Sequence, residues 1–165
     1  MVLTGLTNTP EFIPRWAPTP EQIQHAESLA ASLGMSARLD ARWQTLSQGE
    51  RGKTLIARAL MVDPALLLLD EPATGLDLAA REQLLTALDD LRAHYPKLAS
   101  ILVTHHLEEI PVTTTHAMLI RDGELTAQGP IGDVVTTENI SACFDHAITI
   151  TRRNDRWIAQ ASAST

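Results

Sequence analysis

The hydrophobic pattern in the first part of the chain has the spacing of helices. Between Pro20 and Gly34, apolar residues recur at every third or fourth position, which predicts an amphipathic helix. Thr19 and Gln22 have the spacing of a capping box around a proline at the first helical position, and Gly34 supplies a stop. The helix is therefore expected to begin directly after Thr19.

A second helix and a buried strand are expected next. Ser47 and Glu50 again have capping-box spacing, and the apolar stripe that follows ends at Asp63-Pro64. Directly afterwards, Leu66 to Leu69 form a continuous apolar run. Such a run is typical of a short strand buried on both faces, as in a parallel sheet covered by helices.

A further helix and strand complete an alternating pattern. A helix is expected over Leu78 to His94 with Asp77 as its cap, followed by a second apolar strand from Ser100 to Thr104. A short acidic helix should follow at Leu107 to Ile110. The order strand, helix, strand indicates a parallel α/β sheet with a crossover helix.

Two hairpins are expected in the C-terminal third. Asp122-Gly123 is a strong two-residue turn signal between the stretches 117–121 and 124–128. A second pair of alternating stretches, 147–151 and 157–160, flanks a polar turn. The end of the chain should therefore be richer in β-structure than its beginning.

The two ends of the chain carry no periodic pattern. Prolines at positions 10, 14, 18 and 20 predict an irregular segment up to Pro20, and 161–165 should be a loose tail. A length of 165 residues favours one domain with one core.

Composition and charge narrow the function classes. A hydrophobic content of 44% with 20% charged residues is typical of a globular protein. The net charge of −7 offers no basic patch, so direct nucleic-acid binding is not expected. The single cysteine, Cys143, can form neither an intrachain disulfide nor a CxxC metal site, which favours a reducing cytoplasm. No apolar run approaches the roughly 20 residues that span a bilayer, so a membrane link would require a partner.

Candidate chemistry begins where the leucine strand ends. Asp70 and Glu71 place two carboxylates at the carboxyl edge of a parallel sheet, where ligands bind. One carboxylate can hold a divalent cation while the next polarises a water. Taken alone, two acidic residues that cap a turn at Pro72 are the commoner explanation.

Neighbouring motifs change that weighing. Leu46 to Glu50, Asp70-Glu71, Thr74 to Asp77 and Leu102 to His105 resemble, in order, the signature motif, Walker B motif, D-loop and switch histidine of ABC-type ATPases. The resemblance implies an α/β fold: a P-loop NTPase domain of the ABC type, N-terminally truncated, with a mostly parallel sheet flanked by helices and a C-terminal β-hairpin.

The same resemblance divides the chain into three parts. Residues 1–63 would be part of the helical subdomain with the signature motif. Residues 64–121 would form the core with Walker B, the D-loop and the switch histidine. Residues 122–165 would be the β-rich C-terminal end.

The resemblance also implies residue roles. Asp70 would hold Mg²⁺ through water, Glu71 would be the general base, and His105 would hydrogen-bond the γ-phosphate of ATP. The signature helix, whose N-terminus is suited to an anion, would reach the nucleotide of the opposite subunit in a dimer. Asp77 would couple the two sites. The expected nucleotide-binding residues are Ser47, Gln48, Gly49, Glu50 and Asp77.

Some positions depart from the family pattern. Gln48 and Glu50 replace the commoner glycine and glutamine of the signature, and His106 stands where the family usually has an acidic residue. His106 is the weaker switch candidate, because successive side chains of a strand point to opposite faces.

A phosphate-binding loop of the pattern G-x-x-x-x-G-K-S/T is expected to be missing. Gly52-Lys53-Thr54 matches its end, but Ser47 occupies the first glycine position and 41–45 is no apolar strand. We therefore interpret Lys53 as part of the signature helix. The chain would then begin in mid-domain, with the leucine strand left at an unpaired edge. Three explanations for the missing loop remain open: a start site assigned too late, an interrupted gene, or a split ATPase.

The favoured interpretation is the ATP-hydrolysing subunit of an ABC transporter, which converts ATP and water to ADP and phosphate. It would form a homo- or heterodimer with another ABC ATPase subunit and bind a transmembrane permease subunit. It would be cytoplasmic and peripheral at the inner face of the cell membrane. The alternatives are a non-catalytic or split subunit that donates only a signature motif, and a non-transport ABC ATPase. The motifs do not encode the transported substrate or its direction.

Overall fold

The computed structural model describes residues 1–9 and 13–161, which form two compact units. The first unit ends at Thr104 and the second begins at His105. Within the described residues each unit has its own buried cluster, although the chain length favoured a single core. The expectations for Pro10 and for the tail 162–165 lie outside the described residues.

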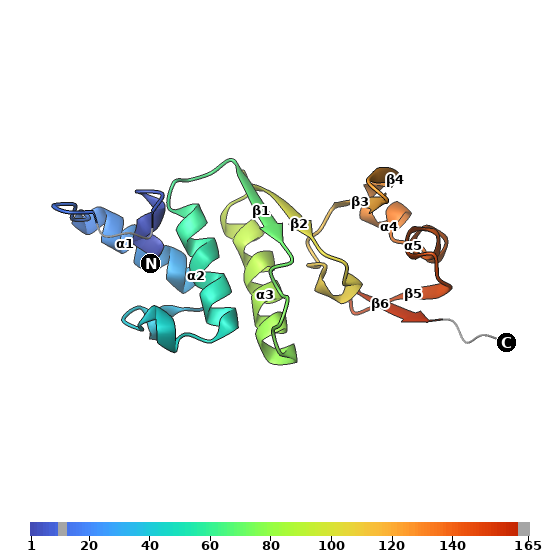
Figure 1. The fold of residues 1–165 in the computed structure, drawn as a ribbon, viewed down its shortest axis with the longest axis horizontal. Helices are drawn as coiled ribbons and strands as arrows, with labels where there is room; N and C mark the ends of the chain where they lie inside the picture. Colours follow the sequence, from blue (N-terminus) through green and yellow to red (C-terminus); the bar gives the residue numbers. More distant parts are fainter. Residues whose placement is uncertain (10–12, 162–165) are drawn as a thin grey trace. The chain divides into compact units, whose positions relative to one another are not determined.

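The first unit alternates helices with two strands (Figure 1). The first two helices begin with the predicted capping boxes, and Asp77 caps the third by accepting a hydrogen bond from the amide of Ala80. Its elements are η1 (Val2–Gly5), α1 (Pro20–Ser32), η2 (Ser36–Arg38), η3 (Trp43–Thr45), α2 (Gln48–Leu60), β1 (Leu66–Asp70), α3 (Leu78–His94) and β2 (Ala99–Val103).

The capping box of α1 leads to a stability prediction. The hydroxyl of Thr19 accepts a hydrogen bond from the amide of Gln22 at 3.3 Å, and the Gln22 side chain accepts one from the amide of Thr19 at 2.9 Å. Thr19→Ala should lower the free energy of unfolding by about 1 kcal/mol, while Thr19→Ser should change it by only a few tenths. Urea unfolding monitored by circular dichroism measures both. Equal losses in the two variants would mean that the hydroxyl does not stabilise the helix.

Strands β1 and β2 pair in parallel, with α3 as the crossover between them. The register runs from Leu66 opposite Ala99 to Asp70 opposite Val103. This confirms the predicted strand, helix, strand order.

The expectation that the leucine strand is buried on both faces is wrong. Leu67 and Leu69 lie in the core cluster, but Leu66 and Leu68 are 46% and 66% exposed. Ile101 and Val103 of β2 are also exposed. Helices α1, α2 and α3 contribute buried residues to one cluster with Leu67 and Leu69, so within the described part of this unit the helices bury one face of the sheet.

The second unit is built on two hairpins, as predicted. Its elements are η4 (Leu107–Glu109), β3 (His116–Arg121), β4 (Glu124–Pro130), α4 (Ile131–Val134), α5 (Thr137–Phe144), β5 (Ile148–Arg153) and β6 (Arg156–Ala161). Strands β3 and β4 are antiparallel, as are β5 and β6. Both two-residue turns have positive φ throughout, at 122–123 and at 154–155, which matches the right-handed twist of hairpins.

Helices α4 and α5 were not predicted. They have only four and eight residues, too few for a helical apolar period to stand out. Thr136 caps α5 through the amide of Asn139, and Asp145 ends it in the left-handed conformation. Ile140 from this helix packs with Val135 and Trp157 in the buried cluster of the second unit.

Candidate functional site

The first part of the candidate site is the carboxyl end of β1. Asp70 is the last residue of the strand, opposite Val103. The amide of Glu71 still donates to the carbonyl of Val103 at 2.9 Å, but its φ of 43° is in the left-handed region and turns the chain away. The two predicted carboxylates are therefore placed in succession where the parallel ladder ends.

The turn after the strand holds the Glu71 carboxylate. The hydroxyl Oγ1 of Thr74 donates to Oε2 of Glu71 at 3.1 Å, and the amide of Thr74 donates to the Glu71 carbonyl at 3.1 Å. The sequence interpretation gave Thr74 no role of its own. A hydroxyl three residues after an acidic side chain, at the start of a turn, was the available signal.

The second part of the site is the start of α2. The hydroxyl of Ser47 accepts from the amide of Glu50 at 3.2 Å, and Oε2 of Glu50 accepts from the amide of Ser47 at 2.8 Å. The first-turn amides of a helix have no acceptors within it and point along its axis toward its N-terminus. This geometry suits an anion, and anion binding at the start of α2 stays a prediction.

The carboxylate of Glu50 is occupied by groups of the chain itself. The guanidinium Nε of Arg38 donates to Oε1 of Glu50 at 2.6 Å, an ion pair that the sequence did not reveal. The amide of Ser47 and the side chain of Arg38 both hold the pKa of Glu50 below its ordinary value. Glu50 therefore stabilises the start of α2 in its charged form.

The signature segment and the D-loop segment are in direct contact. The side-chain amide of Gln48 donates to the carbonyl of Thr74 at 2.8 Å. A Cβ at Gly49 would lie 3.2 Å from the Cβ of Ala80, and one at Gly75, where φ is 75°, would lie 2.9 Å from the Gln48 amide nitrogen. Two segments that are 26 residues apart in sequence therefore meet with little space between them.

The two candidate histidines belong to the second unit. The rings of His105 and His106 contact each other, with centroids 4.1 Å apart, and Nδ1 of His106 lies 3.6 Å from Oε1 of Glu108. Strand β2 ends at Val103, before both residues. The expectation that strand alternation separates His105 from His106 is therefore wrong, because neither is in a strand and their rings lie together.

The near match to a phosphate loop, Gly52-Lys53-Thr54, lies inside α2. The hydroxyl of Thr54 donates to the carbonyl of Glu50 at 2.7 Å, one helical turn back. Lys53 is buried, which lowers the pKa of its ammonium group, while the charge of Glu50 opposes that shift. The interpretation of Lys53 as part of the signature helix is confirmed.

Neither a cluster of metal-ligating side chains nor a membrane-spanning helix is present in the described residues. Over residues 1–9 and 13–161, no group of three or more His, Cys, Asp or Glu side chains is arranged to hold a metal ion. In the same ranges, no helix is both long and apolar enough to cross a bilayer.

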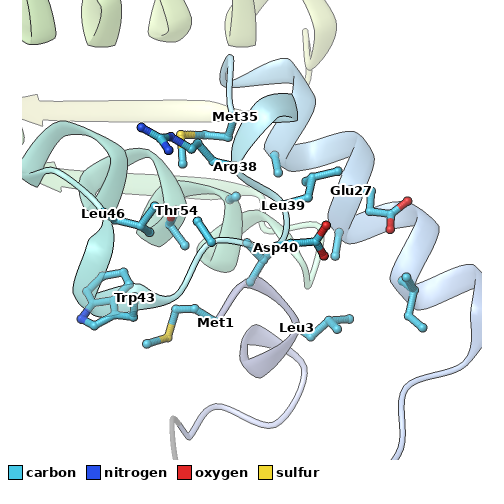
Figure 2. Close-up of a pocket in the computed structure, with 16 residues that line it drawn as sticks. Met1, Leu3, Glu27, Met35, Arg38, Leu39, Asp40, Trp43, Leu46 and Thr54 are labelled. Carbon is cyan, nitrogen blue, oxygen red and sulfur yellow. The ribbon is translucent and has the colours of Figure 1, made fainter.

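The helical segment of the first unit contains a mainly apolar pocket. The cavity has a volume of about 320 Å³ and is lined by η1, α1, α2 and the segment 35–46 (Figure 2). Its polar lining residues include Glu27, Arg38 and Asp40. Asp70, Glu71 and Thr74 do not line it, so the pocket and the candidate chemistry are separate features of this unit.

Sequence comparisons relate the chain to one family. The family model described as ABC transporter matches residues 3–74. An uncharacterized ABC transporter ATP-binding protein of Bacillus subtilis, YlmA, is 45% identical over 140 residues, which are 84% of this chain and 53% of that protein. The molybdenum import ATP-binding protein ModC of Brucella suis is 38% identical over 122 residues, 73% of this chain and 33% of ModC. The chain thus spans about half the length of the first of these relatives.

Solved structures show the same fold. An ATP-binding cassette of an ABC transporter in its ADP conformation matches with a TM-score of 0.70 and 22% identity, over 87% of this chain and 62% of that chain. The protein cbiO1 of Clostridium perfringens, part of the transporter complex cbiONQ, matches with a TM-score of 0.69 and 22% identity, over 86% of this chain and 53% of that chain. At these identities the likeness concerns the fold alone.

Proposed function

Because the chain belongs to the family of ABC transporter ATP-binding proteins, we propose that it acts in the ATP-hydrolysing subunit of an ABC transporter. The observation that carries the proposal is the pair Asp70 and Glu71 at the carboxyl end of β1. The signature helix is hydrogen-bonded to the turn that follows this pair. A strand end with two carboxylates beside a helix N-terminus combines a cation ligand, a base and an anion-binding group.

The carboxylates fit the chemistry of Mg²⁺ with ATP. Mg²⁺ is usually held in proteins by one or two carboxylates together with waters and substrate phosphates, so Asp70 suffices without a cage of protein ligands. Bound MgATP would supply the phosphate group that is transferred to water. Asp70 would orient a water of the cation, and Glu71 would accept a proton from the attacking water.

The remaining predicted residues would act on phosphate oxygens. Ser47 and Gly49 would offer a hydroxyl and a helix-terminal amide to the γ-phosphate bound by a second ATPase subunit. Gln48 and Glu50 would act through the position of this helix, since Glu50 is held by Ser47 and Arg38. His105 would donate to the γ-phosphate. Asp77, the cap of α3, would couple the two nucleotide sites of the dimer.

We assign the membrane contact to the helical part of the chain. A permease subunit would bind the segment 1–43, which contributes most of the apolar pocket. The protein would therefore act at the cytoplasmic face of a membrane through that partner. The transported substrate is left open, because the motifs do not encode it.

A second candidate function leaves nucleotide binding to another subunit. The 165 residues contain no sequence of the form G-x-x-x-x-G-K-S/T, the loop that wraps nucleotide phosphates. In this alternative the chain binds no nucleotide of its own and donates only the signature helix to a site on another subunit. The two candidates differ in whether Asp70 and Glu71 take part in hydrolysis.

The proposal can be tested by removing the metal ion. The protein is recovered from its native cell through an affinity tag introduced in frame at its own locus, so that its natural partners are retained. Phosphate release from ATP should require Mg²⁺, falling by at least about 100-fold in EDTA and returning when Mg²⁺ is restored. Absence of Mg²⁺-dependent hydrolysis in this assembly would contradict the proposal.

A further inference from the structure

We infer that Thr74 is a positioning residue for Glu71 and that Gln48 connects it to the signature helix of the same chain. The inference rests on the proposed function, in which Glu71 is the general base. It adds a role for Thr74 and an intrachain link between the two motifs.

The first observation is the hydrogen bond on the carboxylate. Oγ1 of Thr74 donates to Oε2 of Glu71 at 3.1 Å. Glu71 follows the last residue of β1 and has a φ of 43°, so the backbone itself leaves the regular strand at this residue. A carboxylate accepts hydrogen bonds through its oxygens, so a donor on Oε2 restricts the orientation of the Glu71 carboxylate.

The second observation is that the turn bearing Thr74 is closed on itself. The amide of Thr74 donates to the carbonyl of Glu71 at 3.1 Å, and the amide of Leu76 donates to the carbonyl of Ala73 at 3.1 Å. Ala73, between them, is buried in the core cluster. The hydroxyl of Thr74 is thus presented to Glu71 by a backbone turn anchored in the core.

The third observation is the close contact between this turn and α2. Gln48 donates to the Thr74 carbonyl at 2.8 Å, and Gly75 allows the close approach because a Cβ there would lie 2.9 Å from the Gln48 nitrogen. Gly49 contacts the start of α3 in the same way, at Ala80. A displacement of the signature helix would therefore also displace Thr74, the residue that orients the general base.

These contacts form one continuous path from the signature helix to Glu71. It runs from Gln48 through the carbonyl and hydroxyl of Thr74 to Oε2 of Glu71. The path lies within a single chain, so the geometry of Glu71 depends on the signature helix of its own subunit. Binding of that helix to a nucleotide on the opposite subunit would then change the position of the Glu71 carboxylate.

The test of Thr74 separates hydroxyl chemistry from shape. In the native assembly, Thr74→Val removes the donor with little change in volume and should lower kcat about tenfold, as expected for loss of one hydrogen bond to a charged group. The KM for ATP should stay within about twofold, because Thr74 acts on the base and not on binding. Thr74→Ser keeps the hydroxyl and should retain kcat within about threefold.

A double-mutant cycle identifies the residue through which Thr74 acts. In the Glu71→Gln background the base is already absent, so adding Thr74→Val should change the residual rate by less than about twofold. A full additional tenfold loss, or equal losses in Thr74→Val and Thr74→Ser, would overturn the positioning role. If Glu71→Gln itself hydrolysed ATP at the normal rate, both this role and the proposed catalytic function would be overturned.

The link to the signature helix can be measured without activity. In the 165-residue chain, Gln48→Ala should raise the hydrogen-exchange rates of the Thr74 and Leu76 amides about fivefold, the loss expected for one hydrogen bond. Gln44→Ala is the matched control, because at Gln44 the backbone carbonyl, and not the side chain, accepts the hydrogen bond from Arg51. Unchanged exchange at both amides in Gln48→Ala would contradict the link.

Discussion

Replacing Glu71 by Gln should reduce the turnover of ATP by about 10²–10⁴-fold, the range typical of general-base loss, while ATP binding is retained. The substitution keeps the size of the side chain and an oxygen that can accept from Thr74 at the Oε2 position. It removes the carboxylate that we propose as the acceptor of a proton from the attacking water. Steady-state phosphate release and equilibrium ATP binding by the native assembly measure the two effects separately.

A matched control for Glu71→Gln is available on the surface of the second unit. Glu124→Gln makes the same change in charge at the exposed first residue of β4 and should leave turnover within about twofold. Undiminished turnover in Glu71→Gln would remove Glu71 from the role of base. Gly49→Asp places a charged side chain in the first turn of the signature helix. If turnover were undiminished in Glu71→Gln but abolished in Gly49→Asp, the chain would be a donor of the signature helix only.

Leu67→Ala should lower the free energy of unfolding by about 2–5 kcal/mol, and Leu68→Ala by less than about 1 kcal/mol. The two leucines are neighbours on β1 but face opposite sides of the sheet. Leu67 is 4% exposed and packs in the core cluster, so its truncation leaves a cavity. Leu68 is 66% exposed, so its truncation removes little buried surface.

Urea denaturation of the 165-residue chain and its two variants measures this difference. The comparison is internally controlled, because both substitutions remove the same atoms from the same strand. Equal losses of unfolding free energy would contradict the exposure of one face of β1. They would mean that the face of Leu66 and Leu68 is also buried in solution. The sequence-based expectation of burial on both faces would then be restored.

The elements that could be predicted were those with a local signal. Capping boxes located the starts of α1 and α2, and Asp77 located that of α3. Two polar turns located both hairpins. Helices α4 and α5 could not be predicted in this way, because each is too short to display a periodic apolar face.

The candidate site was predictable in part. The order of the four motifs indicated the family. The similarity of the chain to known ABC transporter ATP-binding proteins agrees with that prediction. The roles of Asp70, Glu71, His105, Asp77 and the signature residues stay predictions. The ion pair between Arg38 and Glu50 left no trace in spacing or composition, since its partners are 12 residues apart and come from different elements.

The sequence alone determined the features that depend on neighbouring residues. These are the helix starts, the turns and the placement of two successive carboxylates at the end of an apolar strand. Only the tertiary structure decided which face of that strand is covered, because four identical leucines carry no information about the side on which helices pack. It also decided that Gln48 meets Thr74, since that contact depends on how α2 and α3 pack and not on any local preference of either segment.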